Sequence, residues 1–101
     1  MKIYLDPSVE KFINSLDCNS TAKVLRVLDL LEKFGSDLRM PHSKNIARNI
    51  FELRIHGEQG VRLFYGFKNN GAIIFYAFIK KSGKIPKKEM DSIIRRSESL
   101  F

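Results

Sequence analysis

The sequence lacks several features that would narrow its class. It has no tryptophan, one cysteine and three prolines among 101 residues. The single cysteine, Cys18, cannot form an internal disulfide and fits a reducing compartment, so we expect a cytoplasmic protein. No apolar run approaches the roughly eighteen residues of a membrane-spanning helix. Asp6 and Glu10 interrupt the N-terminal segment too early for the apolar core of a signal peptide.

Metal-ligand patterns are also missing. The two histidines, His42 and His56, are not spaced with Cys18 as in a zinc site. No cluster of acidic residues suggests a magnesium site. We therefore expect neither a metal nor another cofactor.

Positive charge, in contrast, is abundant and unevenly distributed. The formal net charge is +7. Residues 1–36 carry equal numbers of basic and acidic residues, so the whole excess lies in residues 37–101. This polarity usually indicates a polyanionic partner, of which nucleic acid is the commonest. The alternative is a solvated basic surface that only aids solubility.

The N-terminal segment predicts a short strand followed by a helix. Residues 1–5 alternate in the manner of a strand. Asp6 before Pro7 is the pairing expected of a helix N-cap and a first-turn proline. Residues 9–16 then carry apolar side chains at helical spacing.

A second helix is predicted by the apolar stripe of residues 24–34. Asn19 or Ser20 is expected to cap its start, and Gly35 is placed as its C-terminal stop. The connection between the two helices is only about four residues long, which favours a helical hairpin.

The second half of the chain changes to a period of two. Residues 36–49 show no clear period, and Pro41 disfavours both a helix and a central strand there. Residues 51–56 and 61–68 alternate as two strands, and residues 57–60 form the turn between them.

A third strand and a last helix complete the pattern. Residues 69–71, Asn-Asn-Gly, are a strong hairpin turn. Residues 72–79 are apolar throughout, which predicts a strand that is central or covered on both faces. Pro86 opens the last helix, whose inward-facing residues are expected to be Met90, Ile93 and Ile94.

The order of elements is therefore β-α-α-β-β-β-α. It predicts an α+β fold in one domain over residues 1–101. The sheet is expected to be small, curved and mainly antiparallel, with the N-terminal helical hairpin on one face and a C-terminal helix.

Strand parity predicts a cationic face turned away from the helical hairpin. If the apolar residues 51, 53 and 55 meet the hairpin, then Glu52, Arg54 and His56 face away from it. The parity of the following strand adds the outward-facing residues Arg62, Phe64 and Lys68.

Arg54 and Arg62 are expected to be cross-strand or diagonal neighbours. Like charges placed so closely repel each other, and an anion between them would relieve the repulsion. Arginine suits phosphate because its guanidinium group binds in a forked manner. Phe64 offers a surface on which a nucleobase could stack.

Lysines extend this face at the end of the third strand. Lys80, Lys81 and Lys84 follow it in one short run. The alternative interpretation of the arginines is purely structural: Arg54 pairs with Glu52, Glu58 or Glu89 and has no further role.

The same residues could cleave RNA. Attack by the 2′-hydroxyl needs a base, cations that stabilise the crowded phosphate, and an acid for the leaving oxygen. Arg54, Arg62 and Lys81 could serve the phosphate. His56 is the residue type that exchanges protons near neutral pH, and Glu52 or a lysine among the other cations are further candidates for proton transfer.

Several segments together resemble a known family. The sequence is similar to the HigB-like, phage-derived branch of the RelE/ParE superfamily of type II toxins. The resemblance covers nearly the whole chain, most strongly residues 38–96. It rests on Leu38 and Pro41, Phe51-Glu52-Leu53-Arg54, Arg62-Leu63-Phe64-Tyr65, Phe78-Ile79-Lys80-Lys81, and Lys84-Ile85-Pro86 followed by Glu89, Ile93 and Arg96.

This resemblance implies a RelE-like fold and a ribosome-dependent mRNA endonuclease that inhibits translation. A cognate antitoxin, of the helix-turn-helix DNA-binding kind, would hold it inactive. The residues implied to contact the scissile phosphate are Arg54, Arg62 and Lys81. Lys80 and Lys84 would contact the RNA backbone beside them. The products would be a 2′,3′-cyclic phosphate or 3′-phosphate and a 5′-hydroxyl.

The sequence departs from this family's pattern at two positions. Where some relatives carry a tyrosine that acts as base, the nearest counterpart here is Lys87. Where many relatives have a threonine before the helix proline, this chain has Ile85, a poor N-cap. The proton-transfer residues are therefore left open.

Two other functions compete with the nuclease. ParE-type relatives share the fold and inhibit DNA gyrase without catalysis. An inactive RNA-binding regulatory module is the third possibility. The set of Arg54, Arg62 and Lys81 favours the nuclease, because ParE-type relatives tend to lack it.

Overall fold

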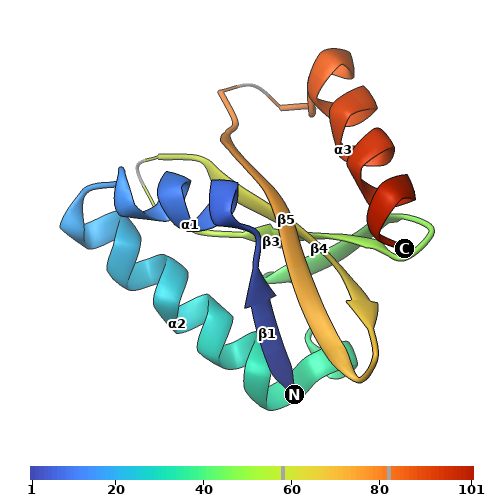
Figure 1. Cartoon of the computed structure of the whole chain (residues 1–101). Coiled ribbons are helices and arrows are strands. Elements are labelled where there is room, and N and C mark those ends of the chain that lie inside the picture. The colour runs from blue at the N-terminus through green and yellow to red at the C-terminus, as the bar shows by residue number, and fades with distance from the viewer. Residues whose placement is uncertain (58, 82) are drawn as a thin grey trace.

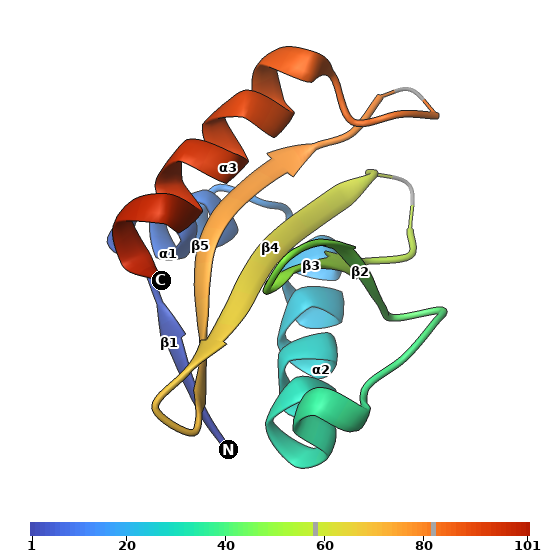
Figure 2. The ribbon, with the colours of Figure 1, turned by 90° about the vertical axis from the view of Figure 1, so that its right-hand side faces the viewer.

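The computed structural model describes residues 1–57, 59–81 and 83–101. Within them, α1 (Pro7–Asn14) and α2 (Cys18–Phe34) lie on one face of a five-stranded sheet, and α3 (Lys87–Leu100) lies on the other (Figures 1 and 2). The expected α+β, RelE-like arrangement with an N-terminal helical hairpin is confirmed. In these ranges no helix is long and apolar enough to cross a membrane.

The sheet contains one strand more than the sequence predicted. Its order is β1-β5-β4-β3-β2, and only the pairing of β1 with β5 is parallel. The additional strand is β2, which follows the short 3₁₀ helix η1 (Gly35–Asp37) and lies at the sheet edge. Its residues 43–45 are polar, so it lacks the apolar alternation that marks a strand. The strand bounds are β1 Lys2–Leu5, β2 Ser43–Ala47, β3 Ile50–Arg54, β4 Val61–Lys68 and β5 Gly71–Ile79.

Aspartates cap the starts of both N-terminal helices. The expected N-cap Asp6 is confirmed: its carboxylate accepts a hydrogen bond from the Ser8 backbone N–H at 2.9 Å and another from the Ser8 hydroxyl. The expected N-cap of α2, Asn19 or Ser20, was wrong, because the helix begins two or three residues earlier than predicted. Asp17 caps the helix, and its carboxylate accepts a hydrogen bond from the Ser20 backbone N–H at 2.7 Å. Ser20 lies in the first helical turn, where the backbone N–H groups have no partner within the helix.

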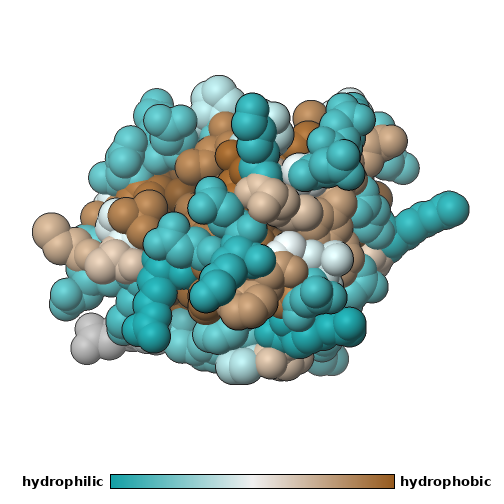
Figure 3. Space-filling view, turned by 90° about the horizontal axis from the view of Figure 1, so that it is seen from below, coloured by the Kyte–Doolittle hydropathy of each residue, from teal (hydrophilic) through white to brown (hydrophobic). Residues whose placement is uncertain are grey.

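Gly35 ends α2 as expected, with a positive φ of 54°. The apolar residues of α2 divide between core and solvent. Its buried residues are Val24, Val27, Leu28 and Leu31, whereas Leu25 and Phe34 are exposed. Seen from below, apolar areas are visible between polar side chains on the surface (Figure 3).

The β4–β5 hairpin has the predicted tight turn and an unpredicted bulge. Asn69 and Asn70 both have positive φ, 53° and 62°, as this turn requires. Farther along, Phe64 pairs with Tyr76 while Tyr65 pairs with Ile74, so Phe75 is the extra residue of a β-bulge. The bulge lets Phe75 and Tyr76 both join the apolar cluster beneath α3.

Two apolar clusters hold the layers together. The larger lies between the sheet and the helical hairpin and contains the predicted inward residues of β3 and β4, among them Leu53, Ile55 and Leu63. The smaller lies between the sheet and α3 and is built on Phe64, Phe75 and other residues. Both faces of β5 are therefore covered, as its apolar sequence predicted.

The C-terminal helix places Ile93 inward and Ile94 outward. Ile93 is fully buried, but the prediction for Ile94 was wrong, since it is 39% exposed. Successive helical residues are about 100° apart, and the buried stripe runs from Ile93 to Ser97 and Leu100. The helix begins at Lys87, and Pro86 supplies no side-chain cap.

We expect Asp6→Ala to lower the free energy of unfolding by about 1 kcal/mol, the usual value of an N-cap, and Tm by about 4–8 °C. The substitution removes the cap of α1 and also an ion pair with Arg96 of α3, 3.2 Å from Asp6 Oδ2. Thermal unfolding followed by circular dichroism measures the change. Glu10→Gln, which removes another carboxylate of α1, is the control and should change Tm much less.

The effect of Asp6 should depend on pH in one direction. The hydrogen bonds from Ser8 hold the pKa of Asp6 below its ordinary value, although partial burial opposes them. Such a group stabilises the fold above its unfolded-state pKa of about 3.9, and this stability is lost as the pH falls through the lower folded-state pKa. The Tm difference between wild type and Asp6→Ala should therefore shrink below about pH 4. A difference that stays constant would contradict this assignment.

Candidate nucleic-acid interface

An outer row of three residues crosses the sheet on the α3 face. Arg54 of β3 lies directly opposite Arg62 of β4, and Arg62 lies directly opposite Phe78 of β5. Residues paired in this way project from the same face of the sheet. Phe78 packs against the apolar cluster beneath α3, which identifies the face. The expected cross-strand pairing of the two arginines is confirmed.

An inner row of residues lies parallel to the outer row, and it is displaced from it by two residues along each strand. It consists of Lys44 of β2, Glu52 of β3, Phe64 of β4 and Tyr76 of β5. Glu52 and Phe64 are fully buried, Tyr76 is half-buried and Lys44 is exposed. Sequence parity could not reveal Lys44, because β2 was not predicted.

The carboxylate of Glu52 lies between the two arginines. Its Oε1 accepts a hydrogen bond from Arg54 Nε at 2.9 Å, and its Oε2 is 3.6 Å from Arg62 Nε. The Glu52 side chain is 2% exposed, against 24% for Arg54 and 19% for Arg62. The anion that relieves the repulsion between the arginines is thus a side chain of the protein itself.

This three-residue cluster is only partly neutralised. Two guanidinium groups face one carboxylate, which leaves one unit of positive charge. Glu52 Oε2 and Arg62 Nε have no hydrogen-bond partner within the described ranges. Arg62 is held by its Nη1, which donates to the Val61 carbonyl oxygen at 3.0 Å. Arg54 is therefore fixed by a short hydrogen bond to Glu52, whereas the contact of Arg62 with Glu52 is longer.

Three of the lysines predicted for the interface follow the end of β5. Lys80 follows Phe78 at the end of β5, where its backbone N–H donates to the Gly60 carbonyl oxygen at 2.7 Å. Lys81 and Lys84 are exposed in the segment that leads to α3. Glu58, which was considered as a partner of Arg54, lies outside the described ranges.

Lys68 is not brought together with these groups. It is the last residue of β4, whereas Arg62 is near the start of that strand. Its Nζ donates to the Leu100 carbonyl oxygen at 2.9 Å. Lys68 therefore binds the C-terminal end of α3 at the opposite end of the strand.

The prediction that Phe64 is an exposed surface for a nucleobase was wrong. Phe64 is fully buried in the cluster with Ile93 of α3. Parity correctly turned Phe64 away from the helical hairpin, but it could not show that another helix covers that part of the face. Phe78 stacks on Phe64, with ring centroids 5.7 Å apart and planes at 7°.

His56 also departs from its predicted position beside the arginines. β3 ends at Arg54, so strand alternation no longer determines where His56 points. Its Nε2 donates to the Pro41 carbonyl oxygen at 3.0 Å. Together with Lys23 and Arg26 of α2, among others, it lines a cleft of about 390 Å³.

Tyr76 and Glu89 form a polar contact between β5 and α3. The phenol of Tyr76 donates to Glu89 Oε1 at 2.7 Å. Partial burial raises the pKa of Tyr76, and the neighbouring Glu89 carboxylate raises it further. The phenol is thus a proton-bearing donor that holds the first turn of α3 on the sheet.

The donor groups do not gather as metal ligands. In the portion of the chain that the structure describes, no three His, Cys, Asp or Glu side chains form a group that could hold a metal ion. The outer row, by contrast, holds two arginines, and Lys80 and Lys81 follow the end of β5. This arrangement can bind a phosphate group at the edge of a largely apolar surface.

A comparison with protein-family models gives one match. The model described as "Phage derived protein Gp49-like (DUF891)" matches residues 11–98. The match includes both rows and extends from α1 into α3. A search of curated proteins finds none that matches the chain.

We expect loss of the Glu52 carboxylate to destabilise the fold and to make the binding of an external anion by the two arginines more favourable. Glu52→Ala should lower the free energy of unfolding by about 2 kcal/mol, because it leaves two guanidinium groups facing each other. Inorganic phosphate should then raise the Tm of the variant more than that of the wild type.

Two further variants separate charge from packing. Glu52→Gln keeps the shape of the side chain and should show the same gain from phosphate. Glu98→Ala removes an exposed carboxylate of α3 and should respond to phosphate like the wild type. Equal phosphate effects in all four proteins would show that Glu52 does not occupy an anion site.

Proposed function

The chain belongs to the Gp49-like family of phage-derived proteins, a RelE-like toxin family, and we propose that it is a type II toxin that stops translation by cutting mRNA on the ribosome. The observation that supports the catalytic part is the facing pair Arg54 and Arg62, held by the buried Glu52. Toxins of this kind act in pairs with an antitoxin, so the family also implies a protein partner.

A structural role alone explains the arginine pair poorly. Half-buried ion clusters can often be replaced by apolar residues without loss of stability. Here the cluster also carries an uncompensated positive charge and leaves polar atoms without hydrogen bonds. Such an arrangement gains most when a phosphate group supplies the missing negative charge.

The proposed reaction needs no group beyond RNA and side chains. The 2′-oxygen of one nucleotide attacks the adjacent phosphorus while its proton passes to a base. The bond from phosphorus to the 5′-oxygen breaks, and that oxygen takes a proton from an acid. Arg54, Arg62 and Lys81 stabilise the negative charge that builds up on the phosphate oxygens. The products are a 2′,3′-cyclic phosphate and a 5′-hydroxyl.

His56 does not lie with the arginines, which leaves Lys81 as the other proton-transfer candidate that the sequence offered. Lys81 lies just beyond Lys80 at the end of β5 and is exposed. His56 lines the cleft beside α2 and donates to Pro41. Glu52, which the sequence also offered as a base, has both carboxylate oxygens directed to arginines. We propose that Glu52 positions the arginines.

The partners follow from this activity. The substrate is mRNA on a translating ribosome in the cytoplasm, and Lys80 and Lys84 contact the RNA backbone beside the scissile phosphate. The antitoxin is proposed to be a helix-turn-helix DNA-binding protein. It would inhibit by covering the outer row or by blocking entry to the ribosome.

We expect Arg62→Ala to reduce mRNA cleavage by about 100-fold or more, the usual cost of removing one group that stabilises transition-state charge. Arg62→Lys should remain impaired, because lysine cannot bind two phosphate oxygens in a forked manner. The measurement is the mapping of new mRNA 5′ ends in a translating extract. Expression of the wild type without an antitoxin should stop growth, and Arg62→Ala should relieve the arrest.

Lys11→Ala, which removes an exposed cation of α1, is the matched control and should cleave like the wild type. The absence of new 5′ ends with wild-type protein and translating ribosomes would rule out the nuclease. Growth arrest with intact mRNA and DNA-damage signalling would favour gyrase inhibition instead.

A further inference from the structure

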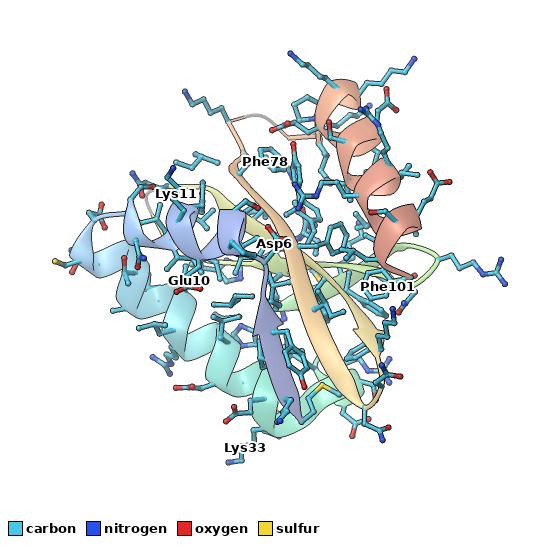
Figure 4. The ribbon with its side chains drawn as sticks, viewed as in Figure 1. Asp6, Glu10, Lys11, Lys33, Phe78 and Phe101 are labelled. Atoms are coloured by element: carbon cyan, nitrogen blue, oxygen red, sulfur yellow. The ribbon has the colours of Figure 1, made fainter. Side chains whose placement is uncertain are left out.

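Phe78 is the aromatic side chain that the fold leaves beside the arginines. It is directly opposite Arg62 and completes the outer row. In Figure 4 it lies next to β5 on the side of α3, far from Phe101 at the other end of that helix. The aromatic residue predicted to be exposed on this face was Phe64, which is buried.

The packing around Phe78 keeps its ring fixed and partly open. Its inner side is stacked on the buried Phe64, with centroids 5.7 Å apart. Tyr76 meets it edge-on at 6.4 Å and is itself tied to Glu89. Phe78 remains half-buried. A rigid, half-exposed ring of this kind loses little conformational freedom when another flat group stacks on it.

The distance between Phe78 and Arg62 suits one nucleotide. Paired residues on neighbouring strands are about 5 Å apart. This separation is comparable to that between a base and the phosphate of the same nucleotide. Arg54 lies one strand farther from Phe78, so a phosphate bound at the two arginines would lie beside the base on Phe78.

We propose that Phe78 is the surface on which a base next to the bound phosphate stacks, and that the outer row thereby binds a nucleotide of single-stranded RNA. This inference rests on the proposed function and specifies how its site holds RNA. Stacking on a phenylalanine tolerates every base, because each base has an aromatic face. We therefore expect the outer row to bind RNA without preference for its base sequence.

The lack of tryptophan provides a direct test. Phe78→Trp introduces the only tryptophan, and its fluorescence should be quenched when a short single-stranded RNA binds. An oligomer of equal length without bases should cause little quenching. Phe101→Trp, an exposed aromatic position at the other end of α3, is the control and should not be quenched by either oligomer.

Affinity measurements separate the base from the phosphate. Phe78→Ala should bind the RNA oligomer about 5- to 100-fold more weakly, the range expected for one stacked base, and should bind the abasic oligomer like the wild type. Phe78→Leu should show the same loss while retaining apolar packing on Phe64. Circular dichroism melts confirm that each variant is folded.

The outcomes distinguish this inference from the proposed function. An absence of quenching of Phe78→Trp by RNA, or equal quenching by both oligomers, overturns the stacking role. Equal loss of affinity for both oligomers in Phe78→Leu also overturns it. If Arg62→Ala binds both oligomers as tightly as the wild type, the phosphate site fails, and with it the basis of the proposed function.

Discussion

The contact of one buried carboxylate with two arginines is the constraint on which the basic face depends. Without Glu52, the paired positions of Arg54 and Arg62 would place two like charges side by side. With it, the arginines are held on the sheet, and the cluster still carries a net positive charge. The arginines are therefore positioned by the protein itself, and the cluster keeps one unit of positive charge for the proposed phosphate contact.

The position of α3 decides which residues of this face meet solvent. The helix buries Phe64 in the inner row but leaves Phe78 in the outer row half-exposed. Two polar contacts hold it at opposite margins of β5: Glu89 with Tyr76, and Arg96 with Asp6. A β-bulge at Phe75 directs additional aromatic surface toward the helix. The apolar cluster beneath α3 thus stabilises the fold and also positions the residues of the candidate site.

The sequence predicted the alternation of β3 and β4 well, because charged residues alternate with apolar ones along β3 and at both ends of β4. It could not place Phe78, since a strand that is apolar throughout shows no parity, and only its register with Arg62 reveals the neighbour. It misplaced His56 because parity ends with the strand. It missed β2 because an edge strand can be polar. The charge pattern thus predicted the two arginines of the outer row, whereas the packing of α3 on the sheet determined that Phe78 is its exposed aromatic residue.

The incomplete neutralisation of the Glu52 cluster has an evolutionary consequence. Removing Glu52 alone leaves two uncompensated half-buried charges, whereas removing either arginine leaves a balanced ion pair. Loss of the cluster is therefore penalised when it begins with Glu52 and tolerated when it begins with an arginine. Chains related to this one that lack Glu52 should accordingly also lack at least one of the two arginines.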